Sequence, residues 1–388
     1  MSAASSTRPE AAPGTRCLLL QLEPTPYILP RALYVYRDEN LHTDLYFTYL
    51  NSSQPWGGDA DIGKIPVLLD PAKSVTQRVA NVLHLMWRIL SGDYTVAHIA
   101  GWGHWVVRLA ILCCKIRGVP FSVESDSPLL ADLRGWREKL KSLLYPVWMQ
   151  WIGYAIPGGL RQAAFFRQYK VPEAKILISH MTVDTAKIRN TTTPPKREFR
   201  VAKGIPQDQI LFVFVGRLLA QKGIDTLLQA FEIVQNGSLL SALVIVGDGP
   251  ERGLVEHAAA KYPGRIWVVG REGSTGVISW LRAGDVLVLP SRDEHWGLVV
   301  NEAMTCGLPV IVSDVCGCVD DLVLPERNGI IFPVDNAAKL AEAMLQLAKQ
   351  EERRVSMGTE SEVLIRPWTI ERQAETIRAA LVRMSYTR

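Results

Sequence analysis

The sequence predicts an α/β protein of two Rossmann-like, doubly wound domains that face each other across a cleft. The chain has 388 residues, which is more than one domain of roughly 100–200 residues holds. From Cys17 onward, short apolar runs alternate with amphipathic stretches, as in repeated βαβ units with parallel sheets. Near the middle, residues 185–200 contain a Thr run and a Pro pair without hydrophobic periodicity, which indicates a linker between two domains.

Each half of the chain supplies its own series of strands. In the N-terminal half, apolar runs predict strands at 17–22, 45–50, 94–100, 120–125, 151–157 and 175–180, with helices between them at about 75–90, 104–117, 131–149 and 160–169. In the C-terminal half, the same pattern predicts strands at 210–216, 242–247, 265–270, 285–290, 309–313 and 329–333. The expected division is a disordered tail over 1–16, an N-terminal domain over 17–190, a C-terminal domain over 191–367, and a helix over 368–388 that can cross back to the N-terminal domain.

Composition excludes several classes of protein. Hydrophobic residues make up 48% and charged residues 21% of the chain, so a disordered or collagen-like protein is excluded. The net charge of +4 divides into +6 for residues 1–190, with 21 basic against 15 acidic residues, and −2 for residues 191–388. This balance excludes a nucleic-acid partner, while the basic N-terminal half is compatible with an anionic ligand or membrane surface. Six cysteines without paired spacing, and no apolar leader after Met1, predict a cytoplasmic location.

Three predicted strands of the C-terminal half end in glycine, at Gly216, Gly247 and Gly270. Ligands of open parallel sheets bind outside the carboxyl ends of the strands, where glycine lets the backbone approach closely. These glycines therefore indicate one ligand site, although each taken singly is also an ordinary turn residue. A dinucleotide site is excluded by spacing, because the glycines of 247–253 are one residue too far apart for GxGxxG.

Two cations follow the first of these strands. Arg217 comes directly after Gly216, and Lys222 precedes the glycine that opens an amphipathic helix. Two cations at the mouth of a parallel sheet can clamp a diphosphate and neutralise charge that grows on it as a leaving group. Taken alone, this pair would be better explained as solvated surface residues.

Two carboxylates in the next informative segment, 291–314, favour the ligand-binding interpretation. Glu294 lies in the loop after a strand, and Glu302 lies about one and a half turns inside the following helix. Glu302 has apolar neighbours on this helix, and a carboxylate there is costly unless it meets hydroxyl groups or other donors. Its position suits a ribose diol, and that of Glu294 suits sugar hydroxyls. The amide groups at the helix start suit a phosphate and belong to Trp296, Gly297 and Leu298.

The segments GRLLAQKG, GDGP, and Glu-x7-Glu followed by AMTCGLPVI resemble the donor half of a retaining glycosyltransferase of the GT-B type, family 4 (group 1). The resemblance implies an enzyme that moves a hexosyl unit from a UDP- or GDP-sugar to an acceptor hydroxyl without a cofactor, in the biosynthesis of cell-surface polysaccharides, glycolipids or other glycosides. It also implies roles for individual residues: Arg217 and Lys222 hold the donor diphosphate, Glu294 the transferred sugar and Glu302 the ribose, with the base near Gly270 and Arg271. Arg217, Lys222 and Glu294 are the expected catalytic residues.

The N-terminal half departs from the family pattern. The usual Gly-Gly loop after the first strand is replaced by EPTPYILP, and the usual His after strand 120–125 is replaced by Glu124, Ser125 and Asp126. Glu124, Asp126 and His104 are therefore candidates for contacts with the acceptor or the sugar. His104 follows a predicted strand end beside tryptophans, where a structural role is equally compatible with the sequence.

Two further segments allow more than one interpretation. Segment 127–170 has seven basic and two acidic residues, with three interleaved tryptophans, which suits an anionic membrane or lipid-diphosphate acceptor. A solvated helix face with core aromatics explains it equally well. Asp59-Ala60-Asp61 is similar to the metal-binding DxD of the other large glycosyltransferase fold, but so short a pattern is common. We expect a solvated loop there and no metal site.

The expected partners are a nucleotide diphosphate sugar and an acceptor that is a sugar, a lipid-linked molecule or a small molecule, with peripheral membrane contact as an option. Two other functions fit the same fold. One is a GT-B phosphorylase or nucleotide-sugar epimerase, and the other is a binder of nucleotide sugars without catalysis.

Overall fold

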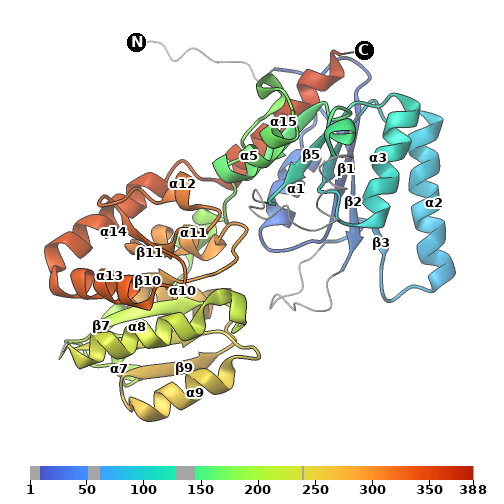
Figure 1. Ribbon diagram of the computed structural model, residues 1–388. Coiled ribbons are helices and arrows are strands. Elements are labelled where there is room, and N and C mark those ends of the chain that lie inside the picture. The colour runs from blue at the N-terminus through green and yellow to red at the C-terminus, as the bar shows by residue number, and fades with distance from the viewer. Residues whose placement is uncertain (1–8, 51–61, 128–144, 238–239, 388) are drawn as a thin grey trace. The chain divides into compact units, whose positions relative to one another are not determined.

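The computed structural model describes residues 9–50, 62–127, 145–237 and 240–387 (Figure 1). The chain divides into two compact units. The N-terminal unit comprises Met1–Met181 and Ile370–Arg388, and the C-terminal unit comprises Thr182–Thr369. The second unit is therefore inserted in the sequence of the first.

The N-terminal unit contains a parallel sheet of six strands in the order β3-β2-β1-β4-β5-β6. Its strands are β1 (Arg16–Gln21), β2 (His42–Tyr49), β3 (Val67–Leu69), β4 (Val96–Ala100), β5 (Phe121–Ser125) and β6 (Tyr154–Pro157). The order reverses between β1 and β4, so the sheet is doubly wound.

Helices cover both faces of this sheet. They are α1 (Ile28–Tyr36), α2 (Val75–Ser91), α3 (Trp105–Arg117), α5 (Leu160–Gln168) and α15 (Ile370–Ser385), with a short 3₁₀ helix, η1 (Glu173–Lys175). One apolar core contains buried residues of α2, α3 and α5, and a second contains buried residues of α1 and α15. The helix from the far end of the chain therefore completes the N-terminal unit.

The C-terminal unit contains a second parallel sheet, in the order β12-β11-β10-β7-β8-β9. Its strands are β7 (Ile210–Val215), β8 (Ser241–Val246), β9 (Ile266–Gly270), β10 (Val286–Leu289), β11 (Val310–Ser313) and β12 (Gly329–Phe332). All the strands predicted for this half are present. The two doubly wound sheets confirm the predicted α/β fold class.

The helices of the C-terminal unit alternate with its strands. They are α6 (Thr185–Asn190), α7 (Lys196–Ala202), the 3₁₀ helix η2 (Ala220–Lys222), α8 (Ile224–Asn236), α9 (Arg252–Lys261), α10 (Ser274–Ala283), α11 (Leu298–Thr305), α12 (Val319–Leu322), α13 (Ala337–Lys349) and α14 (Glu351–Ile365). Its core is made chiefly of apolar residues from the central strands together with α8 and α13.

Two predictions about the elements were wrong. Residues 175–180 do not form a strand of the sheet. Leu177 and Ser179 donate backbone hydrogen bonds to β6, but the only bridge that forms there among the described residues joins Ala155 and Ile176. The edge strand that the sequence missed is β3, which has only three residues and so leaves little periodic signal.

The expected linker over 185–200 is also wrong, because it forms α6 and most of α7. Asp184 caps α6 by accepting a hydrogen bond from the Lys187 amide at 2.8 Å, and Pro195 precedes the first residue of α7. An Asp at the N-cap is a recognised helix-start signal. The division between the units lies after Met181, whereas the expected boundary after residue 190 falls at the end of α6.

Part of the segment expected as a disordered tail is described and packs on α15. The Arg378 guanidinium donates to the carbonyl oxygen of Pro9 at 2.8 Å, and Tyr386 donates to that of Glu10 at 3.0 Å. Because α15 and the residue that follows it supply these donors from more than 360 positions away in the sequence, local composition does not reveal the contact. Residues 1–8 lie outside the described residues.

Among the helices that the structure describes, none combines the length and the apolar character that a transmembrane segment requires.

Candidate functional site

Backbone hydrogen bonds join the loops that follow β7, β8 and β9. The Leu218 amide donates to the carbonyl oxygen of Asp248 at 3.0 Å, and the Gly247 amide donates to that of Gly270 at 2.8 Å. The three glycine-ended strands are neighbours in the sheet, so their carboxyl ends form one continuous edge.

Gly247 is required by the geometry of this edge. Its φ is +151°, and a Cβ atom there would lie 1.8 Å from the carbonyl oxygen of Gly216. This separation is far below any van der Waals contact, and the obstructing atom belongs to the backbone. The close approach of two strand ends therefore explains why glycine stands here.

Lys222 and Glu294 form an ion pair, with 2.5 Å between Lys222 Nζ and Glu294 Oε2. Their side chains are only 17% and 15% exposed, respectively. The backbone brings their loops together at Gly223, where φ is +65° and a Cβ atom would lie 2.1 Å from the carbonyl oxygen of Pro290. The structure thus unites two predicted site residues that lie 72 positions apart.

Arg292 fixes the loop that carries Glu294. Its guanidinium donates to Asp225 at 2.7 Å, to Asp335 at 2.5 Å and to the carbonyl oxygen of Ala220 at 2.8 Å. The hydrogen bond to Asp225 is the main cause that raises the pKa of Arg292. The partners of Arg292 lie on other segments of the chain, so the local sequence pattern did not indicate this residue.

The other cations predicted for the site are exposed. Among the described residues, the Arg217 side chain makes no hydrogen bond or ion pair, and Arg271 is likewise exposed after the end of β9. Glu302 is half-buried in α11, inside the first two turns of the helix. Thus Arg217 and Lys222, although five residues apart, have different surroundings.

The start of α11 has free amide groups. Gly297 is the N-cap residue, with φ +96° and no side chain to cap the helix. Within the described ranges, the amides of Trp296, Gly297 and Leu298 donate no hydrogen bond. The indole of Trp296 is buried and donates to Asn301 Oδ1 at 2.9 Å, so this side chain orders the helix start while the amides stay available.

The Cys316–Cys318 loop packs against the loop of Glu294. The Gly317 amide donates to the carbonyl oxygen of Glu294 at 2.9 Å, and the Cys318 amide donates to that of Trp296 at 3.0 Å. Burial raises the pKa of the Cys316 thiol to about 12. These contacts position the site loop, and the thiol stays protonated at neutral pH.

Taken together, this edge of the C-terminal sheet presents an exposed cation, a cation paired with a carboxylate, and the amide groups of a helix start. Cations and helix N-termini bind anions. Carboxylates accept hydrogen bonds from hydroxyl groups. The arrangement can therefore bind a ligand that is anionic at one end and rich in hydroxyl groups at the other.

In the N-terminal unit, Glu124 belongs to a buried polar cluster at the carboxyl ends of β1 and β5. It forms an ion pair with Arg31 of α1, and Gln21 Oε1 lies 3.4 Å from the Arg31 guanidinium. Burial is the largest single influence on Glu124 and would raise its pKa, but Arg31 and His98 together outweigh it and hold the pKa at about 2. Arg31 lies 93 positions from Glu124, so the sequence pattern gave no sign of this partner.

His98 lies beneath this carboxylate. Its Nδ1 is 3.0 Å from Ser122 Oγ, and its Nε2 is 3.7 Å from Glu124 Oε2. Complete burial lowers the pKa of His98, so the imidazole is neutral at pH 7. Glu124 Oε2 is buried and has no hydrogen-bond partner among the described residues, so one oxygen of this fixed carboxylate is left unsatisfied.

The other two candidates of the N-terminal unit differ from Glu124. His104 is the N-cap of α3, where its Nδ1 accepts a hydrogen bond from the Val106 amide at 3.3 Å. Burial, together with the nearby charge of Arg108, lowers the pKa of His104. Asp126 is exposed in the loop after β5. The capping bond gives His104 a structural role, which the sequence had left open.

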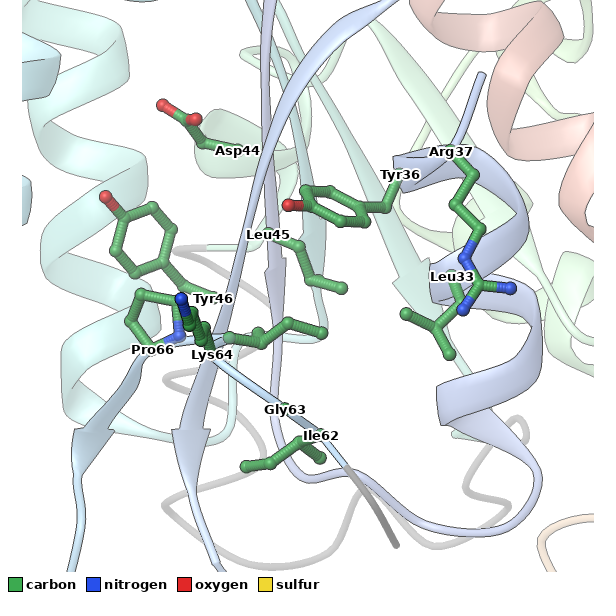
Figure 2. A pocket seen from close by; sticks show the side chains of 11 residues that line it. Leu33, Tyr36, Arg37, Asp44, Leu45, Tyr46, Ile62, Gly63, Lys64 and Pro66 are labelled. Carbon is green, nitrogen blue, oxygen red and sulfur yellow. The ribbon is translucent and has the colours of Figure 1, made fainter. Parts of the chain in front are cut away.

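A cavity of about 370 Å³ lies between α1, the first half of β2 and residues 62–66 (Figure 2). Tyr36, Arg37, Asp44 and Lys64 contribute its polar lining. Because it adjoins the first half of β2, it lies away from the carboxyl ends of the strands, where the candidate residues are.

Three predicted features lie wholly or mostly outside the described residues. They are the Asp59-Ala60-Asp61 tripeptide, the helix expected at about 131–149, and the basic residues Arg134, Arg137, Lys139 and Lys141. In the ranges that are described, no three His, Cys, Asp or Glu side chains are grouped so that they could hold a metal ion.

Residues 195–363 match the family described as glycosyl transferases group 1. Alpha-D-kanosaminyltransferase of Streptomyces kanamyceticus is 28% identical over 195 residues, which cover 50% of this chain and 50% of that protein. The D-inositol 3-phosphate glycosyltransferase of Jonesia denitrificans is 30% identical over 179 residues and 40% of each chain. The chain thus spans half or less of the length of these curated relatives.

Solved structures share the fold over nearly the whole chain. HepE of Anabaena, solved in complex with UDP, has a TM-score of 0.73 and 16% identity, with 95% of this chain and 99% of that chain covered. A glycosyltransferase from Rickettsia africae has a TM-score of 0.74 and 12% identity, with 97% and 100% covered. Because both sequence identities are below 25%, the comparison with these structures establishes the two-domain GT-B fold and nothing about activity.

Proposed function

We propose that this protein is a retaining glycosyltransferase of family 4, which moves a hexosyl unit from a UDP- or GDP-sugar to an acceptor hydroxyl without a metal ion. The observation that carries the proposal is the group formed by exposed Arg217, the Lys222–Glu294 pair and the free amides before α11. This group lies inside the range that matches the group 1 glycosyl transferases. The named relatives transfer glycosyl groups, and HepE was solved with UDP, which supports a nucleotide sugar as donor.

In this proposal, the cations bind the diphosphate and stabilise its departure. When the bond between the anomeric carbon and the phosphate oxygen breaks, positive charge develops on the sugar and negative charge on the diphosphate. Fixed cations and helix amides aimed at the diphosphate lower the energy of that state. Arg217, Lys222 and the α11 start supply this stabilisation, so the reaction needs no metal ion for charge balance.

The two glutamates bind the hydroxyl groups of the donor. Glu294, held by Lys222 and by Ser291 Oγ at 3.3 Å, accepts hydrogen bonds from the transferred sugar. Glu302 accepts them from the ribose, while Gly270 and Arg271 lie beside the base. Because Lys222 pairs with Glu294 in the free protein, one side chain links the sugar contact to the diphosphate contact.

The acceptor is a sugar, a lipid-linked molecule or a small molecule that binds the N-terminal unit. Glu124 is the residue there best suited to bind a hydroxyl group, because its carboxylate is ionised, is oriented by Arg31 and has one buried oxygen without a hydrogen-bond partner. Products of this type belong to the biosynthesis of cell-surface polysaccharides, glycolipids or other glycosides.

A panel of UDP- and GDP-sugars tests the donor assignment, first by thermal shift and then by release of the free nucleotide. A ligand at 100 times its dissociation constant stabilises the protein by about 2.7 kcal/mol. We expect one donor to stabilise the wild type, Arg217→Ala to lose this effect, and Lys349→Ala, an exposed charge on α13, to keep it. Analysis of the product by NMR then shows whether the anomeric configuration is retained.

The outcomes separate the alternatives. Stabilisation without release of nucleotide in the presence of varied acceptors would indicate a binder, and isomerisation of the sugar on the nucleotide would indicate an epimerase. If no nucleotide sugar stabilises the wild type, the donor assignment is wrong.

A further inference from the structure

Helix α2 exposes a stripe of large apolar side chains. Val75, Val79, Leu83, Trp87 and Leu90 are all exposed, and their spacing of three to four residues places them along one side of the helix. The core contacts of α2 are made by a different set, which includes Val82, Leu85, Met86 and Ile89. The exposed stripe is therefore additional to the apolar face that folding requires.

Helix α3 exposes a second apolar group. Trp105, Leu112 and Ile116 are exposed at helical spacing, whereas Val107 and Ala110 are among the residues that pack into the core. The two helices pack against each other and cover the same face of the N-terminal sheet (Figure 1). We call the exposed side chains of these two helices the α2/α3 face.

The charge on this face is entirely positive. The 30 residues of α2 and α3 include no Asp or Glu. Exposed cations are contributed by Arg108, Lys115 and Arg117 of α3 and by Lys73 just before α2. Within the described residues, none of these four forms a salt bridge, so their charge is uncompensated.

We propose that the α2/α3 face docks on an anionic lipid bilayer. Exposed tryptophans and aliphatic side chains enter the boundary between headgroups and acyl chains, while cations on the same surface bind anionic headgroups. The α2/α3 face combines both features and lacks the carboxylates that an anionic surface would repel. This inference goes beyond the proposed function, because it concerns where the protein binds and not what it transfers.

A second copy of the chain fits the charges less well. A symmetric dimer places the same patch of both subunits in contact. Joining two such faces would bring cations against cations, and like charges placed together disfavour association. Charge complementarity therefore favours an anionic membrane over a second copy.

Two of the three tryptophans in the predicted membrane segment 127–170 are not exposed. Trp148 and Trp151 pack against the core of the N-terminal unit, whereas Trp136 and four of the basic residues of that segment lie outside the described residues. Trp151 is further engaged by Lys115, whose Nζ lies 5.6 Å from the ring centroid. In the part of the chain that the structure describes, the exposed tryptophans are Trp87 and Trp105.

Co-sedimentation of the full chain with vesicles tests the proposal. We expect the protein to sediment with vesicles of phosphatidylcholine and phosphatidylglycerol, and to remain in solution with phosphatidylcholine alone. Binding should weaken as salt rises from about 0.01 to about 0.1 M, which shortens the Debye length from about 30 to about 10 Å.

Matched substitutions localise the contact. Leu83→Ser and Ile116→Ser change side chains that are 60% and 68% exposed, and their controls are Val355→Ser and Val201→Ser of the C-terminal unit, at 61% and 66%. Only the first pair should lose vesicle binding, with thermal stability unchanged in all four variants.

Charge substitutions test the electrostatic contribution. Each cation near an anionic surface raises the partition coefficient about fivefold. Arg108→Gln with Lys115→Gln should therefore weaken binding about 25-fold, whereas Lys349→Gln with Arg366→Gln, two exposed cations of the C-terminal unit, should not.

Three results would overturn the proposal: equal binding to both vesicle types, unchanged binding of Leu83→Ser and Ile116→Ser, or a dimer in sedimentation velocity that these two substitutions dissociate. The last result would assign the face to a second copy of the chain. Because the vesicle assay contains no nucleotide sugar, its failure leaves the proposed transferase activity to be judged separately.

Discussion

Replacing Lys222 by Met, Glu294 by Gln, and both together measures the ion pair at the centre of the candidate site. Lys222 Nζ and Glu294 Oε2 are 2.5 Å apart, and both side chains are mostly buried. A hydrogen bond that involves charged groups contributes about 1.5–3 kcal/mol to stability, and a single substitution also leaves the remaining partner unsatisfied. Each single variant should therefore lose about 1.5–3 kcal/mol. The double variant should lose less than the sum of the two.

Scanning calorimetry of the wild type, the two single variants and the double variant gives the coupling energy between the two side chains. The unfolding of the C-terminal unit must be followed as its own transition. We expect a coupling of about 1–2 kcal/mol, because residues in direct contact interact by 0.5–3 kcal/mol. Arg217→Ala is the matched control, since this exposed cation makes no ion pair among the described residues. This substitution should change the free energy of unfolding by no more than about 0.5 kcal/mol.

Transfer activity should respond differently from stability. Arg217→Ala and Lys222→Met should both lower turnover by on the order of 10²–10³, the scale for removing one electrostatic stabiliser. If the stability losses of the two single variants add up to that of the double variant within about 0.3–0.5 kcal/mol, the Lys222–Glu294 pair contributes nothing to stability in solution. Turnover of Arg217→Ala within about threefold of the wild type would refute the assignment of this residue to the diphosphate.

Three further predictions concern other parts of the molecule. Glu124 has a folded-state pKa of about 2, below its ordinary value of 4.5, so its ion pair with Arg31 stabilises the protein above pH 4.5 and this stabilisation is lost as the pH falls toward 2. The stability of Glu124→Gln, measured by acid denaturation, should therefore depend less on pH in this window than the stability of the wild type. Equal pH dependence of the two proteins would contradict the assignment. Gly247→Ala should destabilise the C-terminal unit by more than about 1 kcal/mol, because its Cβ would overlap the Gly216 carbonyl oxygen, as denaturant titration would show; a neutral effect would mean that the strand ends move apart freely. Chelator should leave transfer intact because fixed cations balance the diphosphate, and Asp59→Ala should be silent; loss of activity that manganese restores would overturn metal independence.

Much of the fold was predictable because parallel strands leave strong local signals. Most strands of the C-terminal sheet are apolar runs followed by Gly or Pro, and buried strands of this kind are recognised without knowledge of their partners. Where the signal was short, the prediction failed. β3 has three residues, and residues 175–180 have the composition of a strand but follow β6 with incomplete pairing.

The candidate site was predictable only as a set of residues. Arg217, Lys222 and Glu294 were identified by residue type and position after strands, whereas the ion pair between Lys222 and Glu294 spans 72 positions and depends on how two loops meet. The same limit applies to Arg31 and Glu124, whose pairing follows from the packing of α1 on its sheet. Sequence periodicity specifies which face of an element is buried, but not which charged groups meet across elements.

The return of α15 to the N-terminal unit has a consequence for synthesis on the ribosome. The sheet of this unit is complete once β6 has been made, yet the apolar surface that α15 covers must stay exposed until all of Thr182–Thr369 has been translated. The C-terminal unit is contiguous in sequence and can finish folding as it emerges. Nascent chains that expose apolar surface for longer are more prone to aggregation. The half of the protein that is made first is therefore the half that matures last, and the half that would need a chaperone during translation.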